Sequence, residues 1–186
     1  MAVQIERILF TSEQYEKMIE AGILEEGDNV ELLRGEIVKM APIGLRHAGC
    51  LARLTAIFAA RLGGSVIVWP QNPIRLADDT EPEPDVALLK PASDFYSNAR
   101  PGAQDVLLLV EVADTSLEKD RTVKVPLYAE AGIGLVWIVN LNEDVVEVYS
   151  APVDGAYTEF RRAGRGEIVL LPIAQGISVG VDEVLG

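Results

Sequence analysis

Short apolar runs, separated by glycine, proline and polar turns, dominate this sequence and predict a chain that mixes helices with strands. Residues 47–62 repeat apolar side chains at helical spacing, whereas residues 85–89 and 106–112 are continuous apolar stretches, which we place at the centre of a sheet. The predicted helices are 12–21, 47–62 and 117–131, the last kinked or restarted at Pro126, and the predicted strands are 30–33, 36–40, 66–69, 72–76, 85–89, 106–112, 135–141, 145–149, 157–161, 168–171 and 177–181.

Local signals support several of these boundaries. Thr11 and Gln14 have the spacing of a capping box, which predicts a helix start at residue 12. Arg34-Gly35 lies between two short strands and predicts a hairpin turn. The strands after residue 150 are short, so we expect them to add an edge or a small second sheet. No linker divides the chain, and we expect a single domain over residues 1–186.

Composition narrows the range of functions. The 186 residues are 49% hydrophobic, enough for a full core, and no apolar run is long enough to span a membrane. We therefore expect a soluble, cytoplasmic protein. The net charge of −13 argues against gripping nucleic acid with the whole surface, but it permits a small basic groove around an acidic centre. The single cysteine, Cys50, excludes an internal disulfide and a cysteine-rich zinc site.

Two carboxylates occupy positions where an acid needs a partner. Asp85 stands where its strand becomes apolar, so it either caps the strand or binds a cation. Glu111 follows five apolar residues, which places it inside the sheet, where a carboxylate must be paired or metal-bound. A salt bridge is the alternative for Glu111, and its candidate partners are Lys119, Arg121 and Lys124.

The amine of Lys124 completes a candidate metal site. It follows Glu111 by thirteen residues, in the segment after the second strand. Two carboxylates at the ends of neighbouring strands suit Mg²⁺ or Mn²⁺. Such an ion polarises a phosphate and lowers the pKa of an attacking water, while a lysine stabilises charge in the transition state. The pattern predicts a site for phosphodiester hydrolysis, with Asp85 and Glu111 as metal ligands.

Other polar residues carry weaker signals. His47, the only histidine, begins a helix; it either faces a phosphate or the attacking water, or is a surface or capping group. Glu81 and Glu83 precede the apolar strand, and we interpret both as solvated loop charges. Asp120 lies four residues before Lys124, which predicts an i,i+4 ion pair that could orient the amine.

An ordered set of motifs extends over roughly residues 8–150. Its members are Asn29-Val30-Glu31-Leu32-Leu33-Arg34-Gly35-Glu36-Ile37-Val38, His47 at a helix start, Glu83-Pro84-Asp85, Val110-Glu111-Val112, and then Asp120, Lys124 and Tyr128 before Gly132 and Val136-Trp137-Ile138-Val139. In this order they resemble a large bacterial family of uncharacterised restriction endonucleases in the PD-(D/E)XK nuclease superfamily.

The resemblance implies a mixed α/β fold: a restriction-endonuclease-like core at 8–150, with a central mixed sheet flanked by helices, and extra C-terminal strands at 151–186. It also implies Mg²⁺-dependent hydrolysis of nucleic acid. By position, Asp85 is the aspartate of the Pro-Asp half-motif and Glu111 is the second acid. Ala113 stands where the usual lysine would be, which makes Lys124 its substitute. Glu31 resembles an acid that adds a ligand in related nucleases, and Glu36 competes for that role.

Three functions remain open at this point. The leading one is a metal-dependent endonuclease that acts on DNA, with His47 and Glu31 as further candidate catalytic residues. The alternatives are an inactive binding protein that keeps the nuclease fold and a metal-dependent phosphohydrolase of small phosphate esters. We expect weak binding of nucleic acid, because few phosphates can be neutralised, and a homodimer, because cutting two strands suits two-fold symmetry.

Overall fold

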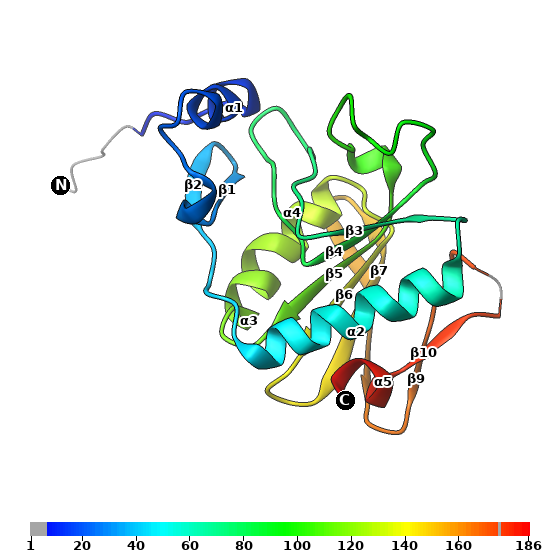
Figure 1. Ribbon diagram of the computed structural model, residues 1–186. Coiled ribbons are helices and arrows are strands. Elements are labelled where there is room, and N and C mark those ends of the chain that lie inside the picture. Colours follow the sequence, from blue (N-terminus) through cyan, green and yellow to red (C-terminus); the bar gives the residue numbers. More distant parts are fainter. Residues whose placement is uncertain (1–6, 175) are drawn as a thin grey trace.

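Strands of this protein gather into one large sheet and two small ones. The computed structural model describes residues 7–174 and 176–186, so residues 1–6 and 175 of the predicted domain lie outside the described part. The strands are β1 (Val30–Leu33), β2 (Glu36–Lys39), β3 (Ile67–Pro70), β4 (Val86–Leu89), β5 (Val106–Ala113), β6 (Leu135–Asn140), β7 (Val145–Val153), β8 (Ala156–Gly164), β9 (Ile168–Leu170) and β10 (Ser178–Gly180). In the described part, β3 to β8 form a six-stranded sheet in chain order, β1 pairs with β2, and β9 pairs with β10 (Figure 1).

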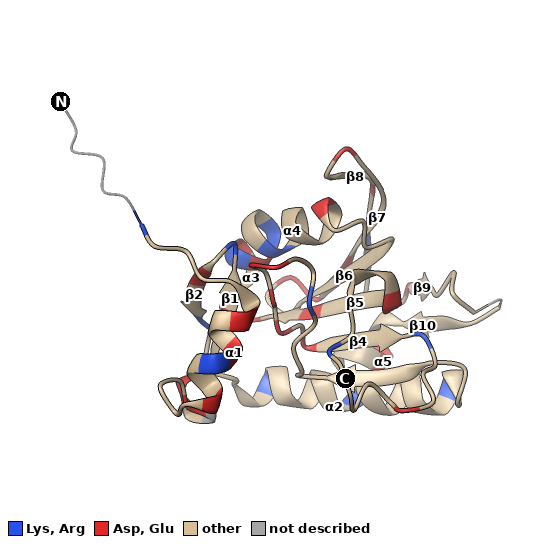
Figure 2. Cartoon of the chain, turned by 90° about the horizontal axis from the view of Figure 1, so that it is seen from above, with Lys and Arg blue, Asp and Glu red and all other residues tan. Residues whose placement is uncertain are grey.

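Helices cover both faces of the six-stranded sheet. The helices and helical turns are α1 (Ser12–Glu20), η1 (Glu26–Asp28), α2 (Leu45–Leu62), η2 (Ala103–Asp105), α3 (Leu117–Lys119), the π-helical turn η3 (Asp120–Lys124), α4 (Val125–Glu130) and α5 (Val181–Leu185). The long helix α2 lies along one side of the sheet, and α3 and α4 lie on the other (Figures 1 and 2). No helix in the described part is long and apolar enough to cross a membrane.

One pair of neighbouring strands in the large sheet is parallel. β5 and β6 run in the same direction, whereas the other neighbours are antiparallel. Parallel neighbours need a crossover connection, usually helical. Here α3, η3 and α4 form that crossover and return the chain over the sheet. The crossover therefore brings the segment after β5 back over β5 itself.

Alternation along the strands builds two cores. Leu54 and Phe58 of α2 pack with Leu88 and Val110 on one face, and the corresponding cluster is fully buried. Tyr128 and Val125 of α4 pack on the other face, in a cluster that includes strand residues 87, 89, 109 and 113. Glu111 alternates with residues 109 and 113, so its side chain projects toward the face covered by α4.

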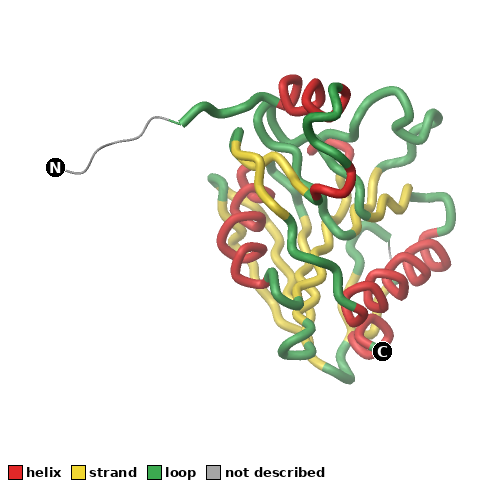
Figure 3. Tube along the Cα trace, turned by 60° about the vertical axis from the view of Figure 1, so that its left-hand side comes forward, coloured by secondary structure: helices red, strands yellow, loops and turns green. Residues whose placement is uncertain are grey.

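Most predicted elements are present, and the mixed α/β architecture is confirmed. The Thr11 hydroxyl accepts from the N–H of Gln14 while the Gln14 side chain accepts from the N–H of Thr11, as a capping box requires. The hairpin turns at Arg34 and Gly35, both with positive φ. After residue 150 the chain adds the edge strand β8 and the small β9–β10 sheet, which were the two alternatives for the tail (Figure 2). Figure 3 shows the strands of the large sheet gathered between helices.

Residues 117–130 are helical in three consecutive pieces, and the π-helical turn ends just before Pro126, which agrees with the predicted interruption there. Two predictions about elements were wrong. Residues 72–76 form no strand; only an isolated bridge joins Arg75 to Gly102, because two prolines interrupt the surrounding segment. The strand that follows Asp85 is buried, but it is the second strand of the sheet and does not lie at its centre.

Candidate active site

Asp85 and Glu111 come from neighbouring antiparallel chain segments and line the same cleft. β4 and β5 pair Val86 with Val110, so Asp85 and Glu111 are the next residue on each of the two segments. The backbone N–H of Val112 donates to Asp85 Oδ2 at 2.7 Å, which fixes this carboxylate against β5. The two acids are therefore neighbours at one end of the sheet.

Glu111 is almost completely buried, with 3% of the residue exposed. Its Oε1 accepts hydrogen bonds from Lys124 Nζ, at 3.0 Å, and from the Tyr128 hydroxyl. Burial raises the pKa of Glu111 to about 8, with Asp120 and Asp85 adding to the effect of burial and Lys124 opposing it. Burial thus favours the protonated form of this carboxyl group, and positive charge beside it favours the ionised form.

Lys124 reaches Glu111 from η3 on the crossover. Nζ also lies 3.3 Å from Glu31 Oε2 and donates to the carbonyl oxygen of Glu83 at 3.2 Å. Burial alone would lower the pKa of Lys124, but the facing carboxylates of Glu111 and Glu31 outweigh burial and raise it. A charged ammonium group thus stands beside the two strands, although Ala113 occupies the usual lysine position.

The hairpin contributes Glu31, not Glu36, to this cluster. Glu31 is buried, and its carboxylate accepts from Lys119 Nζ at 2.6 Å and from the N–H of Glu83 at 3.1 Å. Burial favours a higher pKa for Glu31, but Lys124 and Lys119 lower it below its usual range. Glu36 is exposed and pairs with Arg7 at 2.5 Å. Of the two acids of the hairpin, Glu31 is therefore the one that lines the cleft.

His47 approaches Asp85 from the first turn of α2. Its Nε2 lies 2.8 Å from Asp85 Oδ1, although the ring N–H is not aligned for a hydrogen bond. Burial would lower the pKa of His47, but Asp85 outweighs burial and raises it. The imidazole is 9% exposed, so it belongs to the cleft and is not a surface group.

These side chains line one cleft of about 390 Å³ between the β1–β2 hairpin, the start of α2 and the segment from β5 to η3. Carboxyl groups outnumber basic groups in its lining, so the fully ionised cleft is negatively charged. Its ionisable residues are Glu31, Glu83, Asp85, Glu111, Asp114, Asp120, Lys119, Lys124 and His47. Excess negative charge in a partly buried cleft favours a bound cation.

The donor set fits magnesium better than zinc. Among the described residues, no three His, Cys, Asp or Glu side chains are grouped to hold an ion, as a closed zinc site would require. Mg²⁺ keeps several water ligands and is held by one or two carboxylates together with substrate phosphate. Asp85 and Glu111 can supply those two carboxylates without a third protein ligand.

Lys119, Tyr128 and Asp120 also belong to the cluster. Sequence reasoning assigned no role to Tyr128 and paired Lys119 and Asp120 with other partners. Lys119 pairs with Glu31, and Tyr128 donates to Glu111. Asp120 accepts from the Ser116 hydroxyl at 2.6 Å, and the predicted ion pair with Lys124 is not among the ion pairs of the described residues. The reason is the π-helical turn, because i,i+4 neighbours share a face in an α-helix.

The prediction that Glu81 and Glu83 are solvated was wrong. Glu81 is 1% exposed and pairs with Arg75 at 2.8 Å and Arg100 at 3.3 Å. Glu83 is half-buried in the cleft wall, and burial together with Glu31 raises its pKa. Glu81 and Glu83 are removed from solvent because backbone pairing between Leu32 and Glu81 holds the loop before β4 against β1.

Comparisons with known proteins agree with this architecture. The family model Uma2, described as "Putative restriction endonuclease", matches residues 12–182. A solved structure described as "a putative nuclease belonging to DUF820", from Anabaena variabilis, superposes with a TM-score of 0.72 at 13% identity, over 95% of this chain and 97% of that chain. No curated protein matches the sequence. The structural likeness shows the fold alone, whereas the family model covers most of the chain, and the chain therefore belongs to the Uma2 family of restriction-endonuclease-like proteins.

Proposed function

We propose that this protein is a metal-dependent endonuclease that hydrolyses phosphodiester bonds, with DNA as its substrate. The observation that carries the proposal is the pair of adjacent carboxylates, Asp85 and Glu111, beside the buried ammonium group of Lys124. Membership of a family described as restriction endonucleases supports the same chemistry.

Asp85 and Glu111 are the residues that would hold Mg²⁺ or Mn²⁺. Lys124 and Tyr128 both donate to Glu111 Oε1, and no residue in the described part donates to Oε2. Burial raises the pKa of Glu111, and a divalent cation beside the carboxylate would offset that effect. A cation held by Asp85 and Glu111 would polarise the scissile phosphate and lower the pKa of the attacking water.

The neighbouring side chains have distinct roles in this proposal. The positive charge of Lys124 stabilises the negative charge that develops on the phosphate in the transition state. Glu31 keeps Lys124 charged and oriented, and we assign it this role in preference to metal binding. His47, next to Asp85, accepts a proton from the attacking water or orients that water.

The acidic surface implies contacts with only a few phosphates, as expected of a nuclease that binds DNA weakly. We also propose a homodimer, in which two copies related by a two-fold axis present one cleft to each DNA strand. Sedimentation velocity of the full chain measures this directly, and a monomer at all concentrations would contradict it.

Cleavage assays with matched variants test the function. Plasmid, single-stranded DNA and RNA are incubated at low salt with Mg²⁺ or Mn²⁺. Wild type should cleave only with metal, and Asp85→Ala and Glu111→Ala should lose both cleavage and Mn²⁺ binding by calorimetry. Lys124→Ala should still bind Mn²⁺ but cleave about 10²- to 10³-fold more slowly. Glu36→Ala is the control, because that acid lies on the same hairpin outside the cleft.

The outcomes separate the competing functions. Equal cleavage by wild type and Asp85→Ala would reveal a contaminating nuclease. Hydrolysis of bis(p-nitrophenyl) phosphate without cleavage of any nucleic acid would favour a phosphohydrolase of small esters. No hydrolysis of either substrate in any metal would favour a binding protein that keeps the nuclease fold.

A further inference from the structure

A second buried carboxylate lies on the same face of the sheet, one strand beyond Glu111. Glu111 is in register with Ile138 across β5 and β6, and Ile138 is in register with Glu147 across β6 and β7. The three residues thus form one row. Glu147 is 0% exposed, and a buried charge of this kind requires partners. No step of the proposed hydrolysis involves Glu147.

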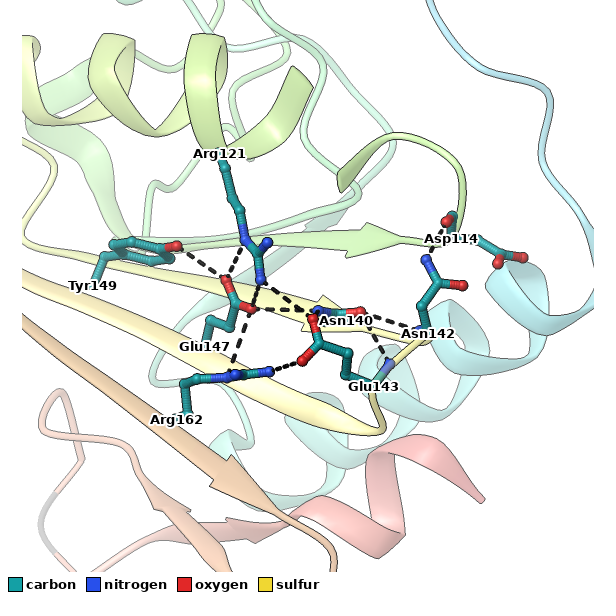
Figure 4. A network of polar contacts seen from close by, with 8 residues as sticks. All are labelled: Asp114, Arg121, Asn140, Asn142, Glu143, Glu147, Tyr149 and Arg162. Carbon is teal, nitrogen blue, oxygen red and sulfur yellow. Dashed lines mark hydrogen bonds and ion pairs between the residues drawn. The ribbon is translucent and has the colours of Figure 1, made fainter. Parts of the chain in front are cut away.

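Glu147 is the centre of a network of polar side chains (Figure 4). Arg121 donates to both carboxylate oxygens, from Nε to Oε2 at 3.0 Å and from Nη2 to Oε1. The Tyr149 hydroxyl donates to Oε2 at 3.0 Å, and Asn140 donates to Oε1 at 3.3 Å. Arg162 is more distant, with Nε 3.9 Å from Oε1. Burial would raise the pKa of Glu147, but these donors lower it, so the carboxylate stays charged.

Arg121 and Lys124 belong to the same π-helical turn. Lys124 binds Glu111 and Arg121 binds Glu147, so two cations attach η3 to two buried carboxylates in one row of the sheet. The backbone alone supports this turn weakly: the N–H of Val125 donates to the carbonyl five residues back, and Pro126 has no N–H to donate. Side-chain contacts must therefore supply much of what fixes the turn.

The network also reaches the other end of the crossover. Asn140 Oδ1 accepts from the backbone N–H groups of Asn142 and Glu143, at 3.1 Å and 3.2 Å. The Asn142 side chain donates to the carbonyl oxygen of Asp114 at 2.6 Å, and Asp114 lines the cleft directly after β5. The polar cluster thus contacts the crossover both at its beginning and at η3.

We propose that Arg121 and Glu147 are positioning residues, whose bidentate pair holds η3 so that the ammonium group of Lys124 stays on Glu111. Neither residue lines the cleft, so both act through Lys124. The inference rests on the proposed function in one respect, because Lys124 matters for catalysis only if the protein is a nuclease. The placement of Lys124, however, can be measured without any activity.

Competitive acylation of lysines, read by mass spectrometry, reports that placement. Lys124 is 4% exposed, so it should react slowly in wild type. Arg121→Gln should speed its acylation at least about 10-fold by loosening η3, while exposed Lys17 reacts as before. Arg162→Gln is the matched control, because it removes an arginine from the same cluster without touching η3. Equal protection of Lys124 in both variants would overturn the proposal.

Kinetic measurements give a second test, because a purely structural role of Arg121 would not produce the result expected here. Under single-turnover conditions, Arg121→Gln should lower the maximal rate about 10-fold or more, with DNA and Mn²⁺ affinities unchanged. In a Lys124→Ala background the same change should add little further loss, because both act on one group. Equal losses in both backgrounds would assign Arg121 to general stability and contradict the proposal.

A conservative variant covers the case in which Arg121→Gln does not fold. Arg121→Lys keeps the charge and loses the planar fork, so it should expose Lys124 to an intermediate degree. Wild-type protection of Lys124 in Arg121→Lys would then overturn the inference. If wild type cleaves no nucleic acid, the proposed function fails, and the acylation rates still decide whether Arg121 positions Lys124.

Discussion

Glu111 holds a proton in the metal-free protein at pH values where an exposed glutamate has lost it. Its pKa is about 8 in the folded chain, against an ordinary value of 4.5. Because the folded pKa is raised, the stabilising contribution of this group is complete below the ordinary value and is lost as the pH rises through about 8. In the metal-free protein, the neutral form of this carboxyl group therefore favours the folded state more than the ionised form does.

Urea unfolding tests this linkage. Between about pH 6 and pH 9, metal-free wild type should lose about 2 kcal/mol relative to Glu111→Gln, whose amide does not titrate. Saturating Mn²⁺ should remove the loss from wild type, because a metal ligand binds in its ionised form. Parallel pH profiles for the two metal-free proteins would show that Glu111 is ionised throughout.

Tyr128 is the second residue that donates a hydrogen bond to Glu111, and it does so through its hydroxyl group. Tyr128→Phe should cost about 1–2 kcal/mol in the free energy of unfolding and should also alter Mn²⁺ affinity, because one donor leaves the ligand carboxylate. Tyr157→Phe is the matched control, since its hydroxyl donates to the Ile133 carbonyl oxygen at 2.8 Å, outside the cleft. If both variants bind Mn²⁺ alike, the Tyr128 hydroxyl has no influence on the site.

The sequence indicated the central residues of the cleft because each breaks a pattern. Asp85 stands at the start of an apolar run and Glu111 interrupts another, and a buried acid needs a partner. The burial of Glu81 was not predictable in the same way, because it depends on a loop folding against a distant strand. Tyr128 follows Lys124 by four residues, and this spacing was the available signal that both reach the same carboxyl group.

Among the elements, those with local causes were predictable. The capping box at Thr11 and the hairpin turn at Gly35 depend on neighbouring residues only, and both form as expected. The π-helical turn does not follow from local pattern, because Pro126 permits either a kink or a restart. In the folded chain, Arg121 of this turn donates to Glu147, a residue that is distant in the sequence.

Gly35 places the hairpin that carries Glu31. Its φ is +77°, and a Cβ there would lie 2.7 Å from the Leu9 Cβ, a distance at which something must shift. Gly22 has a similar φ of +67° but open space around it. Gly22→Ala should therefore cost about 1 kcal/mol from backbone strain alone, and Gly35→Ala should cost at least about 1 kcal/mol more.

Comparing these two glycine variants separates the cost of the steric contact with Leu9 from the cost of backbone strain. Chemical unfolding measures both losses, and Mn²⁺-dependent cleavage shows whether a displaced hairpin also moves Glu31. Equal losses of stability would mean that the segment around Leu9 yields freely and does not hold the hairpin in place.

For the molecule as a whole, the acidic surface is the dominant electrostatic feature. Acidic residues occur on most elements (Figure 2). Many basic side chains are engaged in ion pairs. Lys39 at the end of β2 and Arg46 at the start of α2 flank segments that line the cleft, so they are the basic residues best placed to meet a DNA backbone. Binding should therefore depend on a few local contacts instead of a broad positive face.

Salt dependence of DNA binding measures how many phosphates are contacted. With about three cationic contacts for each cleft, the logarithm of affinity should fall with the logarithm of salt concentration at a slope of about −3. Fluorescence anisotropy of a labelled duplex, with Ca²⁺ replacing Mg²⁺ to prevent cleavage, gives this slope. The double variant Lys39→Gln with Arg46→Gln should make the slope shallower by about 2, since each contact contributes about 0.9. A wild-type slope near about −10 would instead require an extended basic surface, which a chain with a net charge of −13 can provide only through a partner.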